Sequence, residues 1–230
     1  MESLLKVTHL VVGVGGTTVL KEMDFSVEQG ETVVIIGSNG AGKSLLVRTL
    51  MGLIPPIAGS IAWRPGIKIG YVPQKFSVGR HIPITIEEFL ALKGPVSRSK
   101  IVQTLARVGL PETSAQKPLS ILSGGQFQRM IVAWAIIDDP NVLVFDEPTE
   151  SVDVAGQASI YSLINELKKE AAITVFLVTH DLDTVYSFGD RVLCLSQGSL
   201  VCSDSPKKSL SPEMLDTIYG HALHHHGHEH

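Results

Sequence analysis

The sequence contains few of the features that mark membrane, secreted or nucleic-acid-binding proteins. It has only two cysteines in 230 residues, and no apolar run approaches the ~18 residues that a membrane-spanning helix needs. Lys plus Arg total 19 against 23 for Asp plus Glu, without a basic block that could follow a phosphate backbone. The first ten residues also lack a secretion leader. We therefore expect one cytoplasmic globular protein that does not bind nucleic acid.

The two cysteines do not form a recognisable metal-binding or disulfide pattern. Cys194 and Cys202 flank a turn that contains a glycine, and their spacing matches no common ligand motif. In a cytoplasmic chain this favours two reduced residues that pack in the interior. We assign them no function.

Short β-rich runs alternate with amphipathic helical patterns along the chain, which predicts an α/β sheet. One stretch, residues 74–122, interrupts this alternation and reads as an inserted helical subdomain, with a capping-box pattern at residues 85–88. The expected strands are 6–12, 32–36, 68–72, 142–145, 174–178 and 191–195, and the expected helices include 43–53, 100–108 and 156–170.

A glycine-rich segment lies between one expected strand and one expected helix. It has the spacing G-x-x-x-x-G-K-S, in which glycines let successive backbone N–H groups face phosphate oxygens. The lysine adds a positive charge, and the serine hydroxyl offers an oxygen to magnesium. The segment consists of Gly37, Ser38, Asn39, Gly40, Ala41, Gly42, Lys43 and Ser44.

Two further motifs indicate what happens to the phosphate. Asp146 and Glu147 follow an apolar strand, where we expect Asp146 to hold magnesium and Glu147 to polarise water. About twenty residues earlier, a second small-residue segment begins another expected helix, and its N-terminus is suited to an anion. That segment consists of Leu122, Ser123, Gly124, Gly125 and Gln126.

With these motifs in this order, the sequence resembles the ATP-binding subunits of ABC transporters over residues 1 to about 220. The match also includes Gln74 in GYVPQ, Asp153 after the DEPT segment and His180 in VTHD. The resemblance implies an α/β fold: a RecA-like P-loop NTPase core with an N-terminal antiparallel β subdomain. It also implies an inserted α-helical subdomain at about 75–130, and a His-rich tail, 221–230, lies outside the matched domain.

The resemblance further implies roles for these residues. Two copies would pair head to tail, so that the 122–126 segment of one copy meets the ATP held by residues 37–45 of the other. Glu147 would be the general base, while His180 would hold the γ-phosphate and the attacking water. Ser44, Gln74 and Asp146 would bind Mg²⁺, and Asp153 would lie in the D-loop. The homodimer would power a membrane permease from the cytoplasmic face of the cell membrane.

Three positions depart from the family pattern. Val14 stands where the family usually has an aromatic residue stacked on adenine, so we expect weaker and less base-selective nucleotide binding. Leu45 replaces a hydroxyl residue but keeps its backbone N–H for the α-phosphate. Trp134 replaces a usual arginine, and we expect it to pack.

The compact length and the GYVPQ segment resemble the ATPases of zinc and manganese importers, which are supplied by an extracytoplasmic metal-binding protein. Alternating histidines in the tail agree with this interpretation, because imidazole is a preferred zinc ligand. We hypothesise that the tail senses cytosolic zinc through His224, His226, His228 and His230.

Other functions stay open. The chain could energise the import of a different substrate, or act as a non-transport ABC protein, although such proteins usually carry two ATPase units or a long coiled coil. A metal-binding module with a degenerate nucleotide site would leave the intact Lys43, Asp146, Glu147 and His180 unexplained. A GTPase would be expected to carry a base-reading NKxD-type segment, which is not in the sequence.

Overall fold

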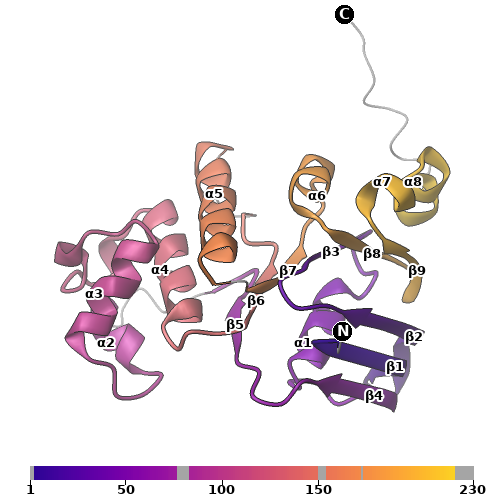
Figure 1. Ribbon diagram of the computed structural model, residues 1–230, viewed down its shortest axis with the longest axis horizontal. Coiled ribbons are helices and arrows are strands. Elements are labelled where there is room, and N and C mark those ends of the chain that lie inside the picture. The colour runs from indigo at the N-terminus through magenta and orange to yellow at the C-terminus, as the bar shows by residue number, and fades with distance from the viewer. Residues whose placement is uncertain (1–2, 77–82, 150–153, 172, 221–230) are drawn as a thin grey trace, which may run out of the picture. The chain divides into compact units, whose positions relative to one another are not determined.

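The computed structural model describes residues 3–76, 83–149, 154–171 and 173–220. It divides into two compact units, which are considered separately (Figure 1). The first unit comprises Met1–Gly66 and Thr174–His230, and the second comprises Ile67–Ile173. Within the described ranges, no helix has the length and apolar character needed to span a membrane.

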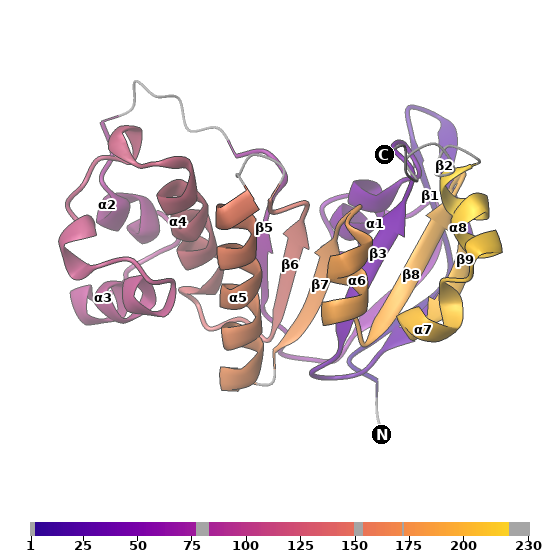
Figure 2. The same ribbon diagram turned by 90° about the horizontal axis from the view of Figure 1, so that it is seen from above.

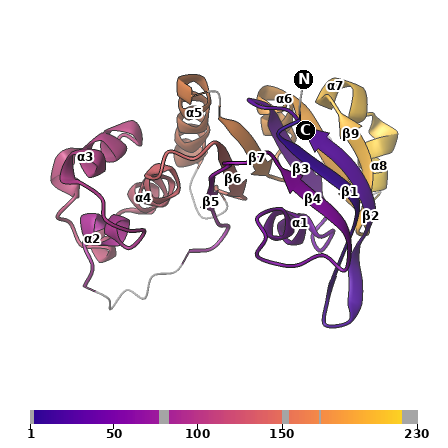
Figure 3. The same cartoon turned by 60° about the horizontal axis from the view of Figure 1, so that its bottom comes forward.

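The first unit contains a three-stranded antiparallel sheet in the order β2-β1-β4. Figure 3 shows its three strands side by side. Buried and exposed residues alternate along much of β1 and β2, as expected for a sheet with one face on the core. The strands are β1 (Leu5–Val14), β2 (Thr17–Val27) and β4 (Ala58–Trp63).

A second set of strands in this unit runs in the order β7-β3-β8-β9 (Figure 2). β3 pairs in parallel with both β7 and β8, and β9 is antiparallel to β8. All residues of β3 and β7 are buried, as expected for strands covered on both faces. The strands are β3 (Thr32–Gly37), β7 (Thr174–Val178), β8 (Arg191–Ser196) and β9 (Ser199–Asp204).

Helices cover both faces of these strands. In Figure 1, α1 lies on the same side as the antiparallel sheet, and α6, α7 and α8 lie on the other side. The helices are α1 (Lys43–Leu50), α6 (Leu182–Phe188), α7 (Pro206–Ser209) and α8 (Pro212–Tyr219).

The second unit joins two parallel strands to a group of helices. β5 (Ile69–Val72) pairs with β6 (Val142–Asp146), and Gly70 lets α4 approach closely, because a Cβ there would lie 2.3 Å from the Ala135 carbonyl oxygen. The expected capping box is confirmed, since Thr85 and Glu88 bond reciprocally at the start of α2. The helices are α2 (Ile86–Ala91), α3 (Arg98–Arg107), α4 (Gly124–Ile136) and α5 (Val154–Ala171), with 3-10 turns at Glu112–Ser114 and Leu119–Ile121.

The expectation of two reduced cysteines is wrong in this structure. Cys194 of β8 and Cys202 of β9 lie directly opposite each other and form a disulfide, with their Cα atoms 4.9 Å apart. Their separation of eight residues is spanned by a tight hairpin, which brings the two side chains within bonding range. The linear sequence shows the glycine turn but not the register that pairs these two positions.

Candidate functional site

The glycine-rich loop lies where the sequence predicts it, between the end of β3 and the start of α1. Gly37 packs against the neighbouring strand, since a Cβ there would lie 2.5 Å from the Leu195 carbonyl oxygen. Gly42 has φ 100°, a value that favours glycine, and a Cβ there would lie 2.3 Å from a methyl carbon of Leu20. Gly37 is therefore required because backbone lies so close, and Gly42 chiefly because of its φ.

The loop ends at a helix N-terminus that is suited to an anion. Gly42 is the N-cap of α1 and provides no side-chain cap, and the first turn contains no acidic residue. Lys43 is buried, and its Nζ donates to the carbonyl oxygens of Gly37 at 2.9 Å and Ser38 at 3.2 Å. A buried ammonium beside the positive end of a helix dipole attracts phosphate.

His180 lies at the same edge of the sheet as this loop. Ile35 of β3 pairs in parallel with Val178 of β7, and both Gly37 and His180 follow these partners by two residues. The side chain of His180 is exposed, between the buried Thr179 and Asp181, which caps α6. The first unit therefore brings the loop and His180 to the carboxyl ends of adjacent strands.

The second unit repeats this arrangement with different residues. Val72 of β5 pairs with Phe145 of β6, so that Gln74 and Glu147 each follow the paired residues by two positions. Gln74 Nε2 donates to Glu147 Oε2 at 3.0 Å. Asp146 is fully buried, and one of its carboxylate oxygens accepts from the Tyr71 hydroxyl at 3.3 Å. Two carboxylates and a carboxamide thus meet at one end of these strands.

The backbone at Glu147 has an unusual conformation. Its φ of 48° lies in the left-handed region, which is uncommon for residues other than glycine and often occurs at functional sites. The hydrogen bond from Gln74 fixes the carboxylate of a residue whose backbone turns sharply away from the strand. Glu147 is therefore oriented by two features that do not belong to regular secondary structure.

The 122–126 segment caps a helix as predicted. Ser123 is the N-cap of α4, and its hydroxyl accepts from the Gln126 backbone N–H while the Gln126 side chain accepts from the Ser123 N–H. Leu122 comes directly before it, and Gly124 and Gly125 form the first two helical positions. A side-chain Cβ at either glycine would meet no atom within 4 Å. The fold of the single chain leaves space at these two positions.

The remaining predicted residues fall into two groups, those outside the described ranges and those whose position alone is known. Asp153 and the tail histidines His224, His226, His228 and His230 lie outside the described residues. Leu45 lies in the first turn of α1, and Val14 ends β1 with an exposed fraction of 57%. An exposed valine of this kind presents no ring to a base.

Sequence reasoning missed two features of the second unit. It overlooked Tyr71, although its place on β5, opposite Val144 and two positions from Asp146 in the register, could have indicated the contact. It also missed a cluster of aromatic rings around Trp134, whose ring lies 4.5 Å from that of Phe89 and 5.4 Å from the Lys93 ammonium. The predicted packing role of Trp134 is confirmed.

Comparisons with known proteins agree on the family. The profile of the ABC transporter family matches residues 20–150. Zinc import ATP-binding protein ZnuC of Yersinia pestis bv. Antiqua (strain Antiqua) is 40% identical over 237 residues, covering 100% of this chain and 92% of the relative. The ZnuC protein of Cereibacter sphaeroides is 38% identical, with 95% and 89% covered.

Solved structures show the same fold. The cbiO1 protein of Clostridium perfringens, part of the ABC transporter complex cbiONQ, superposes with a TM-score of 0.79 at 28% identity, covering 94% of this chain and 93% of that one. MJ1267, an ATP-binding cassette of an ABC transporter in its ADP conformation, superposes with a TM-score of 0.82 at 21% identity, with 94% and 98% covered. The predicted α/β P-loop fold with an antiparallel sheet is confirmed.

Proposed function

Because the chain belongs to the ABC transporter family and is an ATP-binding ATPase of that family, we propose that it powers the import of a divalent metal ion, zinc or manganese. The identity of 38–40% to zinc import ATP-binding proteins over nearly the whole chain carries this proposal. As an ABC ATPase of an import system, it works as a dimer with a membrane permease. We place it on the cytoplasmic face of the cell membrane, attached through that permease, and an extracytoplasmic metal-binding protein delivers the metal.

The residues of the phosphate loop bind the nucleotide in this proposal. The backbone of Gly37–Gly42 and the α1 N-terminus hold the β- and γ-phosphates of ATP, and the Lys43 ammonium exchanges loop carbonyls for phosphate oxygens. Leu45 offers its backbone N–H to the α-phosphate. A buried lysine already held inside the loop needs little reorganisation when the anion arrives.

Oxygen donors suited to magnesium are present. Mg²⁺ prefers carboxylate, amide and hydroxyl oxygens, and Ser44, Gln74 and Asp146 offer these groups. Asp146 is fully buried beside the Tyr71 hydroxyl, and a carboxylate in the interior of a protein is typically paired or coordinates a cation. When bound, Mg²⁺ neutralises charge on the phosphate oxygens.

Glu147 is the proposed general base. Its carboxylate is oriented by Gln74, and it accepts a proton from the water that attacks the γ-phosphate. His180 donates a hydrogen bond to the γ-phosphate and orients that water. The segment from Leu122 to Gln126 approaches the γ-phosphate bound by the second copy, with Ser123 and Gly125 nearest, and Asp153 belongs to the D-loop.

Reconstitution with the permease in proteoliposomes tests this proposal. We expect ATP-dependent uptake of Zn²⁺ or Mn²⁺ that is coupled to phosphate release. Glu147→Gln should abolish this uptake. Glu166→Gln should keep it, because this control variant removes only an exposed carboxylate from α5. Uptake of neither metal alongside normal phosphate release would refute metal import and leave an ABC ATPase for another substrate. Absence of phosphate release in both glutamine variants and the parent would refute the ATPase roles.

We propose that the tail binds zinc and restrains import when the metal is plentiful. Deletion of residues 221–230 is expected to make uptake insensitive to cytosolic-side zinc in the same proteoliposomes. Unchanged inhibition by zinc after the deletion would contradict a sensing role.

A further inference from the structure

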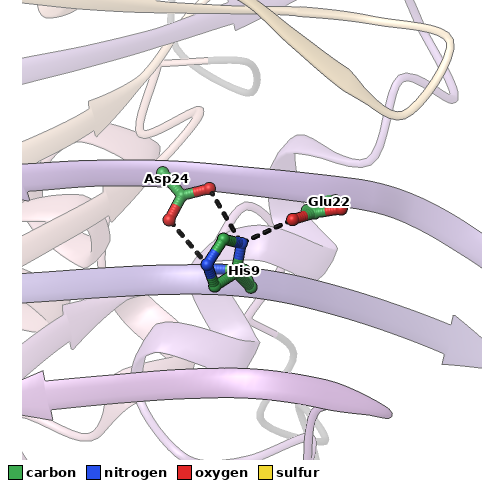
Figure 4. A group of neighbouring side chains, drawn as sticks. All are labelled: His9, Glu22 and Asp24. Carbon is green, nitrogen blue, oxygen red and sulfur yellow. Dashed lines mark hydrogen bonds and ion pairs between the residues drawn. The ribbon is translucent and has the colours of Figure 1, made fainter.

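A histidine and two carboxylates meet on the exposed face of the antiparallel sheet (Figure 4). Figure 4 shows the His9 ring of β1 facing the side chains of Glu22 and Asp24, which come from the neighbouring strand β2. His9 Nδ1 lies 2.5 Å from Glu22 Oε1 and 3.6 Å from Asp24 Oδ2. One potential ligand atom from each residue lies within 4.8 Å of the other two. None of these residues belongs to the proposed ATPase machinery.

An irregularity in strand pairing creates this arrangement. In β1 the buried residues are Leu5 and Val7, then Leu10 and Val12, so the alternation shifts by one position at the intervening pair. A bulge of this kind inserts one extra residue and redirects a side chain. Without it, His9 would continue the buried face. With it, the imidazole points to solvent on the side that carries both carboxylates.

The bulge is held by specific local features. His9 has φ 48°, and its backbone N–H donates to Asp24 Oδ1 at 2.9 Å. On the other side, β4 approaches so closely at Gly59 that a Cβ there would lie 2.2 Å from the His9 carbonyl oxygen. The His9 backbone is therefore fixed by its neighbours on both sides, which positions the imidazole before any ligand arrives.

The donor set suits a divalent cation of the first transition row. Zn²⁺ accepts imidazole nitrogen and carboxylate oxygen at roughly 2.0–2.2 Å, so ligand atoms around a tetrahedral ion lie roughly 3.4 Å apart. The separation of His9 Nδ1 from Asp24 Oδ2, 3.6 Å, already matches this value. Glu22 needs to retreat by about 1 Å, which its largely exposed side chain permits by rotation. Two carboxylates would balance the charge of the ion, and water would complete its coordination.

We propose that His9, Glu22 and Asp24 form a binding site for Zn²⁺ or a similar first-row divalent cation on the surface of this ATPase. Its three ligands are neither proposed nucleotide-binding residues nor histidines of the tail. It does not depend on which substrate the transporter carries, because the inference stands on the bulge and on the three ligands that it brings together.

The test uses the full-length chain with the six tail histidines replaced by glutamine, so that the tail does not contribute to binding. Zn²⁺ is titrated calorimetrically with excess Mg²⁺ and ADP present, and Co²⁺ serves as a spectroscopic probe of nitrogen and oxygen coordination. We expect one bound ion per chain. His9→Asn, which keeps a residue tolerant of positive φ, and Glu22→Gln are each expected to weaken binding by at least about ten-fold.

His81→Gln is the matched control, because it removes one imidazole from a different part of the chain and should leave affinity unchanged. Phosphate release by each variant checks that the fold is intact. Absence of zinc binding in the parent chain, or an affinity that stays within about two-fold in both His9→Asn and Glu22→Gln, would overturn the proposal. The three residues would then form a surface ion pair only.

Discussion

Gly125 offers a test in which stability and activity are expected to change in opposite directions. It occupies the second position of α4, in the segment that we propose to contact ATP on the second copy. A Cβ at this position would meet no atom within 4 Å, and its φ is not positive. The single chain therefore has no structural need for glycine here. If glycine is required, the requirement comes from something that approaches from outside.

The position of Gly125 allows the changes in stability and in rate for Gly125→Ala to be estimated. Replacement of glycine by alanine at an unstrained helical position stabilises a protein by about 0.4–1 kcal/mol, mainly because the unfolded chain loses freedom. For a chain of this size this corresponds to an increase in Tm of about 1–4 °C. A methyl group placed against the incoming phosphate would displace the reacting groups by about 1 Å, a misplacement that can cost about 100-fold in rate.

Thermal unfolding of the isolated chain and phosphate release by the reconstituted transporter are the two measurements. Gly70→Ala is the control, because its Cβ would lie 2.3 Å from the Ala135 carbonyl oxygen and should lower stability by about 1–3 kcal/mol. Gly125→Ala with a higher Tm and unchanged phosphate release would refute the contact with ATP. Gly125→Ala with a lower Tm would refute the structural reasoning.

Three further predictions address other parts of the chain. Glu147→Gln keeps an oxygen that can accept a hydrogen bond from Gln74, so we expect fluorescent-nucleotide titrations to show that ATP binding persists. Phosphate release should fall by ~100 to 10,000-fold, because the general base is lost. A rate of phosphate release above half of the parent value would remove Glu147 from the role of base. Val14→Tyr is expected to strengthen binding of ATP by about 1–3 kcal/mol through base stacking, and competition titrations that show no gain would place the base elsewhere. The Thr85 backbone N–H, followed by its hydroxyl, lowers the pKa of Glu88 below its usual 4.5. The stabilisation that the ionised Glu88 carboxylate provides is therefore complete above pH 4.5 and is lost as the pH falls through the lower pKa that Glu88 has in the folded chain. In urea unfolding, acidification should therefore destabilise the parent more than Glu88→Gln. Equal losses of stability in the two chains would contradict this prediction.

Local signals in the sequence predicted the position of the glycine-rich loop, the capping box of Thr85 and most buried strands. Each of these depends on a few adjacent residues, whose conformational preferences agree with their place in the fold. Boundaries were less well predicted. The first helix was expected to reach residue 53 but ends at Leu50, because Gly52 has φ 74° and turns the chain before the two prolines that follow.

Features that depend on pairing between distant segments were not predicted. β2, β4 and β9 have weak alternation at their ends and gain stability from the neighbours with which they pair. The Cys194–Cys202 disulfide requires the register of β8 with β9. The same limit hid the histidine of the bulge, because a one-residue shift in β1 decides on which face the His9 side chain lies.

Parallel pairing explains why candidate site residues could nevertheless be proposed from the sequence. In each unit, two strands run side by side in register, and the candidate site residues lie two positions past a paired apolar residue. Gly37, which begins the glycine-rich loop, lies level with His180 in the first unit, and Gln74 lies level with Glu147 in the second. Gln74 and Glu147 are 73 residues apart in sequence, yet their side chains bond at 3.0 Å. Because the side chains of successive strand residues point to opposite faces of the sheet, the deletion of one residue from β6 would reverse the directions in which the Asp146 and Glu147 side chains point. The role that we propose for the edge of each unit therefore depends on strand length as strictly as on the identity of the residues that follow.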